Sequence, residues 1–241
     1  MIRAILFDLG NTLAGYYDLP QFPAILDQCI GGAVQSLRKE GWRSSVSEDE
    51  LRLRIGAEKH TAKDFAVTPL AGRLARIFDL VAEKDGALID AACSAFMQPI
   101  LALGTVYEDS VPTLRALRRA GFTMAIVTNS PWGSPAELWR TEIRRLGLAE
   151  HVDAIVCCGD VGWRKPAAPI FQLAMAKLGA RPEECVFVGD DPRWDIVGPQ
   201  ALGIEAILID RSGTQDLKSV PMIRNLTELV SRLCPNGDRR E

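Results

Sequence analysis

The sequence predicts an α/β protein, in which a parallel sheet forms a core and an all-helical block is inserted after the first strand. From Gly104 onward, apolar runs of strand length alternate with segments of helical length, which is typical of a parallel sheet with helices on both faces. Between residues 15 and 104 we find no convincing strand, and apolar residues recur at helical spacing. We therefore expect a Rossmann-like core of residues 1–14 and 105–241 and a helical cap of residues 15–104.

The inserted block is expected to contain four helices. Leu26, Ile30, Val34 and Leu37 are spaced as on one face of a helix. Glycine and proline residues, Gly86 among them, divide the block into predicted helices over residues 21–40, 48–64, 70–84 and 87–101. Such a block would lie over the carboxyl edge of the sheet, where it could act as a lid that excludes water and selects substrates.

The core elements follow at short intervals. Strands are predicted over residues 2–8, 122–128, 154–157, 185–189 and 206–209, and helices over residues 109–120, 134–146, 168–178, 194–202 and 226–233. The segment Ser134-Pro-Ala-Glu137 has the pattern of a capping box with proline in the first turn. Residues 235–241 are expected to be frayed.

Composition excludes several classes of partner. The 241 residues include 47% hydrophobic residues, enough for a sizeable core, and carry a net charge of −3 without a basic stripe, which argues against nucleic-acid binding. Apolar stretches are too short for a membrane span, and the N-terminus does not have the pattern of a signal peptide. The six cysteines lack disulfide or metal-site spacing, so we expect reduced thiols and a cytoplasmic protein. The oligomeric state, a homodimer included, is left open.

Four segments place chemically active side chains at strand ends or just before helices. The first is Asp8-Leu-Gly10-Asn-Thr12, and the second is Thr128-Asn129-Ser130. The third contains Arg164-Lys165-Pro166, and the fourth is Gly189-Asp190-Asp191-Pro-Arg-Trp-Asp195. Because open parallel sheets bind ligands at the carboxyl ends of their strands, we expect these side chains to meet at one edge. His60 and His151 are isolated, and the three tryptophans near the segments, Trp132, Trp163 and Trp194, are expected to be packing residues.

In order and in content, these segments resemble the four motifs of the haloacid dehalogenase superfamily, over nearly the whole chain. The resemblance implies that Asp8 attacks phosphorus and forms an aspartyl-phosphate. It also implies that Thr128 binds phosphoryl oxygens and that Lys165 pairs with both Asp8 and the phosphoryl group. Asn129 would orient the turn, and direct contact with the substrate is a second role open to it.

The resemblance further implies a Mg²⁺ site. Asp190 would bind the ion together with Asp8 and the backbone carbonyl of Gly10, an all-oxygen ligand set that suits a hard cation. Asp195 would be an outer acid that orients metal-bound water, with Asp191 as a less favoured alternative. The implied activity is Mg²⁺-dependent hydrolysis of a small phosphorylated metabolite.

Gly10 departs from the pattern of the superfamily. Most of its phosphatases carry a second Asp at this position, which protonates the leaving group and later activates water. Such a group contributes about 10²–10⁴-fold to the rate. Without it, the proton would come from water, from Tyr16, Tyr17 or Asp18, or would not be needed because the leaving group is good, as in acyl phosphates, aryl phosphates and sugar 1-phosphates.

Three other interpretations stay open. A 2-haloacid dehalogenase displaces halide with the same Asp and needs no acid, and Trp194-Asp195 resembles its fourth motif, but such enzymes need no metal and usually lack an acid like Asp190. A phosphonoacetaldehyde hydrolase has a small residue at the position of Gly10 and uses a cap lysine, for which Lys59 is a candidate. A non-catalytic protein that binds phosphorylated metabolites would explain the missing acid, but not the nucleophile.

Overall fold

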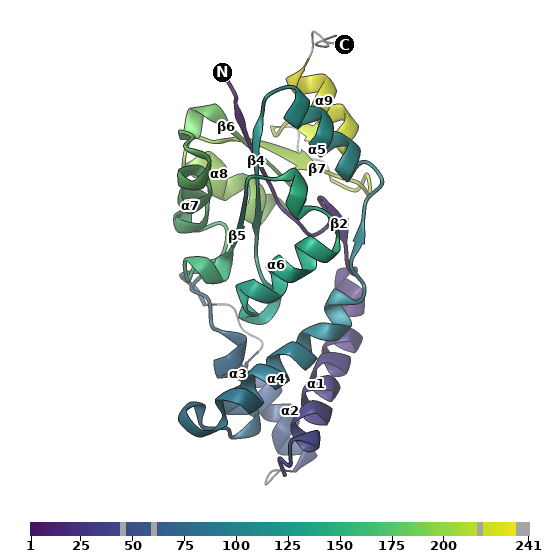
Figure 1. The fold of residues 1–241 in the computed structure, drawn as a ribbon, viewed down its shortest axis with the longest axis vertical. Coiled ribbons are helices and arrows are strands. Elements are labelled where there is room, and N and C mark those ends of the chain that lie inside the picture. Colours follow the sequence, from purple (N-terminus) through teal and green to yellow (C-terminus); the bar gives the residue numbers. More distant parts are fainter. Residues whose placement is uncertain (44–46, 59–61, 216–218, 235–241) are drawn as a thin grey trace.

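A computed structural model describes residues 1–43, 47–58, 62–215 and 219–234 of the chain. Its centre is a six-stranded sheet in the order β5-β4-β1-β6-β7-β8, in which all neighbouring strands are parallel (Figure 1). The strands are β1 (Ala4–Phe7), β4 (Thr123–Thr128), β5 (Ala154–Cys157), β6 (Cys185–Gly189), β7 (Glu205–Ile209) and β8 (Met222–Ile223). This sheet confirms the predicted α/β class. Of the six strands of this sheet, the two-residue edge strand β8 is the one that the sequence did not predict.

Helices cover both faces of the sheet. Phe7 of β1 faces the apolar cluster that contains residues of α5 (Ser110–Arg119), α6 (Ala136–Arg145) and α9 (Leu226–Leu233). Leu6, the preceding residue, faces the opposite cluster, which contains residues of α7 (Ala168–Leu178). The short helix α8 (Val197–Ala201) lies beside α7. The alternation along β1 shows why a strand buried on both faces reads as a continuous apolar run.

The remaining helices form a layer of their own. They are α1 (Phe22–Lys39), α2 (Glu48–Ala57), α3 (Leu70–Phe78) and α4 (Ala82–Leu101), and they occupy the lower half of Figure 1. α1 packs along α4, and the two backbones approach closely at Gly32, where a Cβ would overlap the Ala95 carbonyl oxygen. The chain enters and leaves this layer through a two-stranded antiparallel ribbon, β2 (Ala14–Gly15) and β3 (Thr105–Val106), which was not predicted.

Some helix boundaries in this layer differ from the prediction. The break expected at Gly86 has a counterpart at Asp85, whose backbone is non-helical within α4 (φ −110°, ψ 18°). However, α3 already ends at Phe78, Asp79 adopts a left-handed φ of 58°, and α4 begins at Ala82. The Asp85 carboxylate accepts a hydrogen bond from the Val81 N–H at 2.8 Å, which supplies a partner at the start of α4. The helix expected over residues 48–64 starts as predicted but ends at Ala57. Lys59, His60 and residues 235–241 lie outside the described residues.

The predicted capping box at Ser134 is also wrong. α6 begins after Pro135, whose position offers no side-chain cap. The Ser134 hydroxyl instead accepts a hydrogen bond from the Trp139 indole N–H at 2.8 Å. A side chain of α6 itself therefore occupies the oxygen that the sequence pattern assigned to the helix backbone.

The helix expected over residues 194–202 begins differently as well. A π-helical turn, Pro192–Ile196, comes first, and α8 follows it. Asp191 caps this turn, because its side chain accepts a hydrogen bond from the Arg193 N–H at 2.9 Å. Proline in the first position suits a helix start, since its missing N–H would have no helical partner there.

No helix among the described residues combines the length and the apolar character that a membrane span requires. The longest of them, α1 and α4, have 18 and 20 residues, and charged or polar side chains interrupt both.

Candidate active site

The strand order explains why distant segments of the sequence meet. β1 lies between β4 and β6 in the sheet, so the residues that end or follow these three strands are neighbours at its carboxyl edge. Asp8 follows β1, Thr128 ends β4, and Asp190 follows β6. Lys165 reaches the same edge from the loop between β5 and α7. All four line one cavity of about 470 Å³, so the structure brings together the residues that the sequence singled out.

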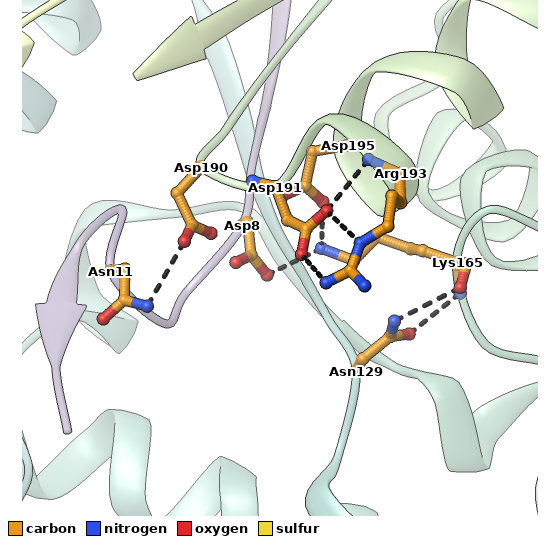
Figure 2. Close-up of polar contacts among 8 residues, drawn as sticks. All are labelled: Asp8, Asn11, Asn129, Lys165, Asp190, Asp191, Arg193 and Asp195. Atoms are coloured by element: carbon orange, nitrogen blue, oxygen red, sulfur yellow. Dashed lines mark hydrogen bonds and ion pairs between the residues drawn. The ribbon is translucent and has the colours of Figure 1, made fainter. Parts of the chain in front are cut away.

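A buried lysine joins two of the carboxylates. Lys165 Nζ donates to Asp8 Oδ1 at 2.7 Å and to Asp195 Oδ1 at 2.6 Å (Figure 2). Lys165 is 2% exposed and Asp195 1%. Burial alone would lower the pKa of Lys165, but Asp195 and Asp8 raise it above its usual value. The lysine is therefore an ammonium. Its positive charge offsets the free-energy cost of burying the Asp8 and Asp195 carboxylates.

Asp195, which we expected as an outer acid, has two partners inside the protein. Its Oδ1 accepts a hydrogen bond from Lys165, and its Oδ2 accepts the Asp191 N–H at 3.1 Å. Burial raises the pKa of Asp195 to about 6, with Lys165 opposing the rise and Asp8 adding to it. Gly189 makes this position available, because a Cβ there would overlap the Asp195 carboxylate.

Asp190 completes a group of three acids. One carboxylate oxygen from each of Asp8, Asp190 and Asp195 lies within 4.8 Å of the other two. Burial raises the pKa of Asp190 to about 8, and the charges of Asp8 and Asp195 add to the rise. Three carboxylates share one ammonium, so the group is short of positive charge. A hard divalent cation with oxygen ligands fits this donor set.

The loop after β1 turns sharply between Asp8 and β2. The Leu9 carbonyl accepts hydrogen bonds from the N–H groups of Leu13 and Ala14, and Asn11 has a positive φ of 55°, which asparagine tolerates better than most residues. Asn11 Nδ2 donates to Asp190 Oδ2 at 3.2 Å (Figure 2). Gly10 lines the cavity, and a Cβ built there would have no atom within 4 Å. The missing acid is therefore not a steric requirement of the fold.

The side chain of Asn129 makes two hydrogen bonds with the backbone of Lys165. Its Oδ1 accepts the Lys165 N–H at 2.8 Å, and its Nδ2 donates to the Lys165 carbonyl at 3.3 Å (Figure 2). This pair of bonds fixes the backbone that carries Lys165. Asp191, the alternative outer acid, is instead paired with Arg193, whose guanidinium lies 2.7 Å away, so it is not part of the lysine-centred group.

Several residues of the cavity gave no signal in the sequence. Besides Tyr16 and Tyr17, which follow the first segment, and Trp194, which we expected to be a packing residue, the apolar walls are formed by Ile100, Pro131 and Trp139. Ile100 comes from α4 and Trp139 from α6. Only the tertiary arrangement brings such residues to the same cavity, whereas the proximity of the two tyrosines to Asp8 along the chain was a usable signal.

Comparison with known proteins places this geometry in context. A family model described as haloacid dehalogenase-like hydrolase matches residues 2–203. Glyceraldehyde 3-phosphate phosphatase of Methanopyrus kandleri is 30% identical over 225 residues, which cover 90% of this chain and 88% of that protein. Two solved structures are similar: a HAD phosphatase from Thermococcus onnurineus (TM-score 0.67, 27% identity, 97% and 98% of the two chains) and 2-haloacid dehalogenase from Pseudomonas syringae pv. Tomato DC3000 (TM-score 0.68, 25% identity, 98% and 99%).

Proposed function

Because this chain belongs to the haloacid dehalogenase-like hydrolase family, we propose that it is a Mg²⁺-dependent phosphatase acting on a small phosphorylated metabolite. The observation that supports this most strongly is the ion pair between Lys165 and Asp8 inside the cavity, with Asp190 beside it. A nucleophilic carboxylate must be aimed at its target, and the hydrogen bond from the buried Lys165 ammonium fixes the orientation of the Asp8 carboxylate.

In the proposed reaction, a carboxylate oxygen of Asp8 attacks phosphorus, the bond from phosphorus to the leaving oxygen breaks, and an aspartyl-phosphate forms. Thr128 and Lys165 bind the phosphoryl oxygens, and Asn129 keeps the lysine backbone in place. Water then attacks the aspartyl-phosphate, releases inorganic phosphate and restores the Asp8 carboxylate. Mg²⁺, held by Asp8, Asp190 and the Gly10 carbonyl with Asp195 in an outer position, would neutralise phosphoryl charge during the transfer.

Gly10 restricts which esters react well. No carboxylic acid stands two residues after Asp8, so the leaving oxygen departs without a proton from that position. An alkoxide is a poor leaving group without such help, whereas an acyl, aryl or anomeric oxygen is better able to depart as an anion. We therefore assign the enzyme to esters and anhydrides with good leaving groups.

We further propose that residues 15–104 act as a cap over a core of residues 1–14 and 105–241. Two backbone hydrogen bonds of 2.8 Å support this, from the Arg164 N–H to the Phe65 carbonyl and from the Val67 N–H to the Gly162 carbonyl. They tie the α2–α3 connection to the loop that delivers Lys165. Trp132, from the loop after β4, also enters the helical layer, where its ring lies 5.3 Å from that of Phe96.

A 2-haloacid dehalogenase is the second candidate. The absence of an acid at position 10 and a dehalogenase among the similar structures favour it, although the residue of the dehalogenases at this position differs from Gly10. Asp190 argues against it, because 2-haloacid dehalogenases need no metal and usually lack an acid at this position. The phosphonoacetaldehyde hydrolase alternative depends on Lys59, which lies outside the described residues. A pure binding protein would not require the buried ion pair at Asp8.

The proposal is tested by phosphate release from acetyl phosphate and p-nitrophenyl phosphate, with Mg²⁺ and with EDTA. We expect release that requires the metal and that is lost in Asp8→Asn. Chloride release from (S)-2-chloropropionate in EDTA, without phosphate release from either compound, would replace the phosphatase with the dehalogenase.

A further inference from the structure

We propose that the outer part of the cavity is a subsite for a flat, uncharged leaving group, so that the substrates are phosphate esters of phenols or of similarly planar neutral alcohols. This inference rests on the proposed function and narrows it to a substrate class. Three features of the described residues carry it: aromatic walls, the fixed orientation of those walls, and the distribution of charge.

The walls next to the nucleophile are largely aromatic. Tyr16, Tyr17, Trp139 and Trp194 line the cavity together with the aliphatic side chains Ile100 and Pro131. Stacking and edge contacts with such rings favour a planar partner. Lys165 and Thr128, which would bind the phosphoryl group, are polar. The cavity thus offers polar contacts for the phosphoryl group and aromatic contacts for the leaving group.

The rings are held in place by other contacts. Tyr17 stacks on Phe22 with ring centroids 5.6 Å apart. Tyr16 meets Trp139 edge-on at 5.6 Å, and the Trp139 indole is fixed by its hydrogen bond to Ser134. Because these side chains lose little freedom when a ligand enters, the subsite is preorganised for one shape.

Charge excludes a second anionic group. Among the described residues that line the cavity, the acids are Asp8, Asp18, Asp190, Asp191 and Asp195, and the one basic side chain is Lys165. Lys165 is already engaged by Asp8 and Asp195. Arg164 does not line the cavity, and its guanidinium donates to the Ser130 carbonyl at 3.2 Å. Asp191 is paired with Arg193, so Asp18 is the acid that a carboxylate on the leaving group would face, and that carboxylate would lose water without gaining the lysine as a partner.

The chemistry at Gly10 agrees with this substrate class. A phenolate spreads its negative charge over the ring and departs without a general acid. The same molecule that fits the aromatic walls is therefore one that does not require the proton donor that the chain lacks.

The experiment compares phenyl phosphate with 4-carboxyphenyl phosphate, each corrected for its uncatalysed hydrolysis. The two rings differ by one negative charge. We expect kcat/KM to be at least about tenfold lower for the carboxylated ester, as one uncompensated charge in a partly buried site predicts. Equal values in an enzyme that hydrolyses acetyl phosphate would overturn the subsite but not the phosphatase. Absence of Mg²⁺-dependent release from every compound, acetyl phosphate included, would overturn both.

Two variants and one control test which residues form the subsite for the leaving group. Tyr17→Ala should lower the ratio of kcat/KM for phenyl phosphate to that for acetyl phosphate by about tenfold, as expected for the loss of one aromatic wall. Asp18→Asn should narrow the gap between the two aryl esters. Trp163→Ala removes an exposed ring that does not line the cavity and should change neither ratio. An unchanged ratio in Tyr17→Ala would remove the aromatic wall from the explanation.

Discussion

Lys165 Nζ lies 2.7 Å from Asp8 Oδ1, although the two residues are 157 positions apart in the sequence. The lysine is almost fully buried and makes a second bond of 2.6 Å to Asp195. One cation thus supports two acids that would otherwise be unpaired in the interior. The same contact is a source of stability and, in our proposal, the means by which the Asp8 carboxylate is held in position for attack.

Lys165→Met should destabilise the protein by about 3–5 kcal/mol, because it leaves buried carboxylates without their cation. The free energy of unfolding in urea measures this effect at neutral pH. Lys177→Met, an exposed lysine on α7, is the matched control and should cost little. If both variants unfold at the same urea concentration, Lys165 does not carry the charge balance that we assign to it.

Wild-type turnover should fall steeply as the leaving group becomes more basic, because Gly10 cannot supply a proton to the departing oxygen. A series of substituted phenyl phosphates, with kcat/KM plotted against the pKa of the phenol, measures this dependence. The series needs substituents that are uncharged and small, so that the cavity treats them alike. A flat plot would mean that another group protonates the leaving oxygen.

Gly10→Asp should restore the absent acid and raise kcat on alkyl phosphates by about 10²–10⁴-fold, the usual contribution of a positioned general acid–base group. The structure permits the change, since a Cβ at Gly10 would have no atom within 4 Å. The plot for aryl esters should flatten in the same variant. Gly10→Asn has the same shape without the acid, and an equal gain in that variant would contradict the explanation.

The pH dependence of metal binding should follow Asp190. Burial, Asp8 and Asp195 raise the pKa of this carboxyl to about 8 in the metal-free protein, so a cation must displace a proton at lower pH. We expect the dissociation constant of Mg²⁺, measured by calorimetry, to rise as pH falls below 8. Asp190→Asn should weaken the binding of Mg²⁺ at every pH, and a pH-independent constant in the wild type would contradict this assignment.

The raised pKa of Asp190 should also make the stability of the metal-free protein depend on pH. The folded pKa of Asp190 lies above the ordinary value of 3.8, so the folded state keeps a proton that the unfolded chain has lost. Between about pH 4 and pH 8, stability in EDTA should therefore decrease as pH rises. Thermal unfolding of Asp190→Asn in EDTA should show a shallower decrease and a higher Tm near pH 8 than the wild type.

Much of the fold could be predicted because most local signals agreed with the tertiary structure. The apolar runs became buried parallel strands, and the side chains at their ends converged because Asp8, Thr128 and Asp190 lie on adjacent strands. Where a signal failed, another nearby group had replaced the expected partner. Ser134 accepts a hydrogen bond from the Trp139 indole of the same helix rather than from a backbone N–H at the helix start. Asp85 accepts the Val81 N–H, so that α4 starts before Gly86.

The same reasoning applies to the candidate site. Its residue types could be predicted from spacing and from the family resemblance, but the partners of each carboxylate could not. Asp191 and Asp195 are both acids in one short segment, and only the π-helical turn decides that Asp195 faces Lys165 while Asp191 pairs with Arg193. The walls that Ile100 and Trp139 contribute depend on how helices from separate parts of the chain meet.

The most direct test of the central claim is mass spectrometry of the protein quenched in acid during turnover of acetyl phosphate with Mg²⁺. We predict that one phosphoryl group is added to the peptide that contains Asp8, and that Asp8→Asn carries none and releases no phosphate. Metal-dependent phosphate release that continues at the wild-type rate in Asp8→Asn, with no phosphorylated peptide in either protein, would contradict the assignment of Asp8 as the nucleophile.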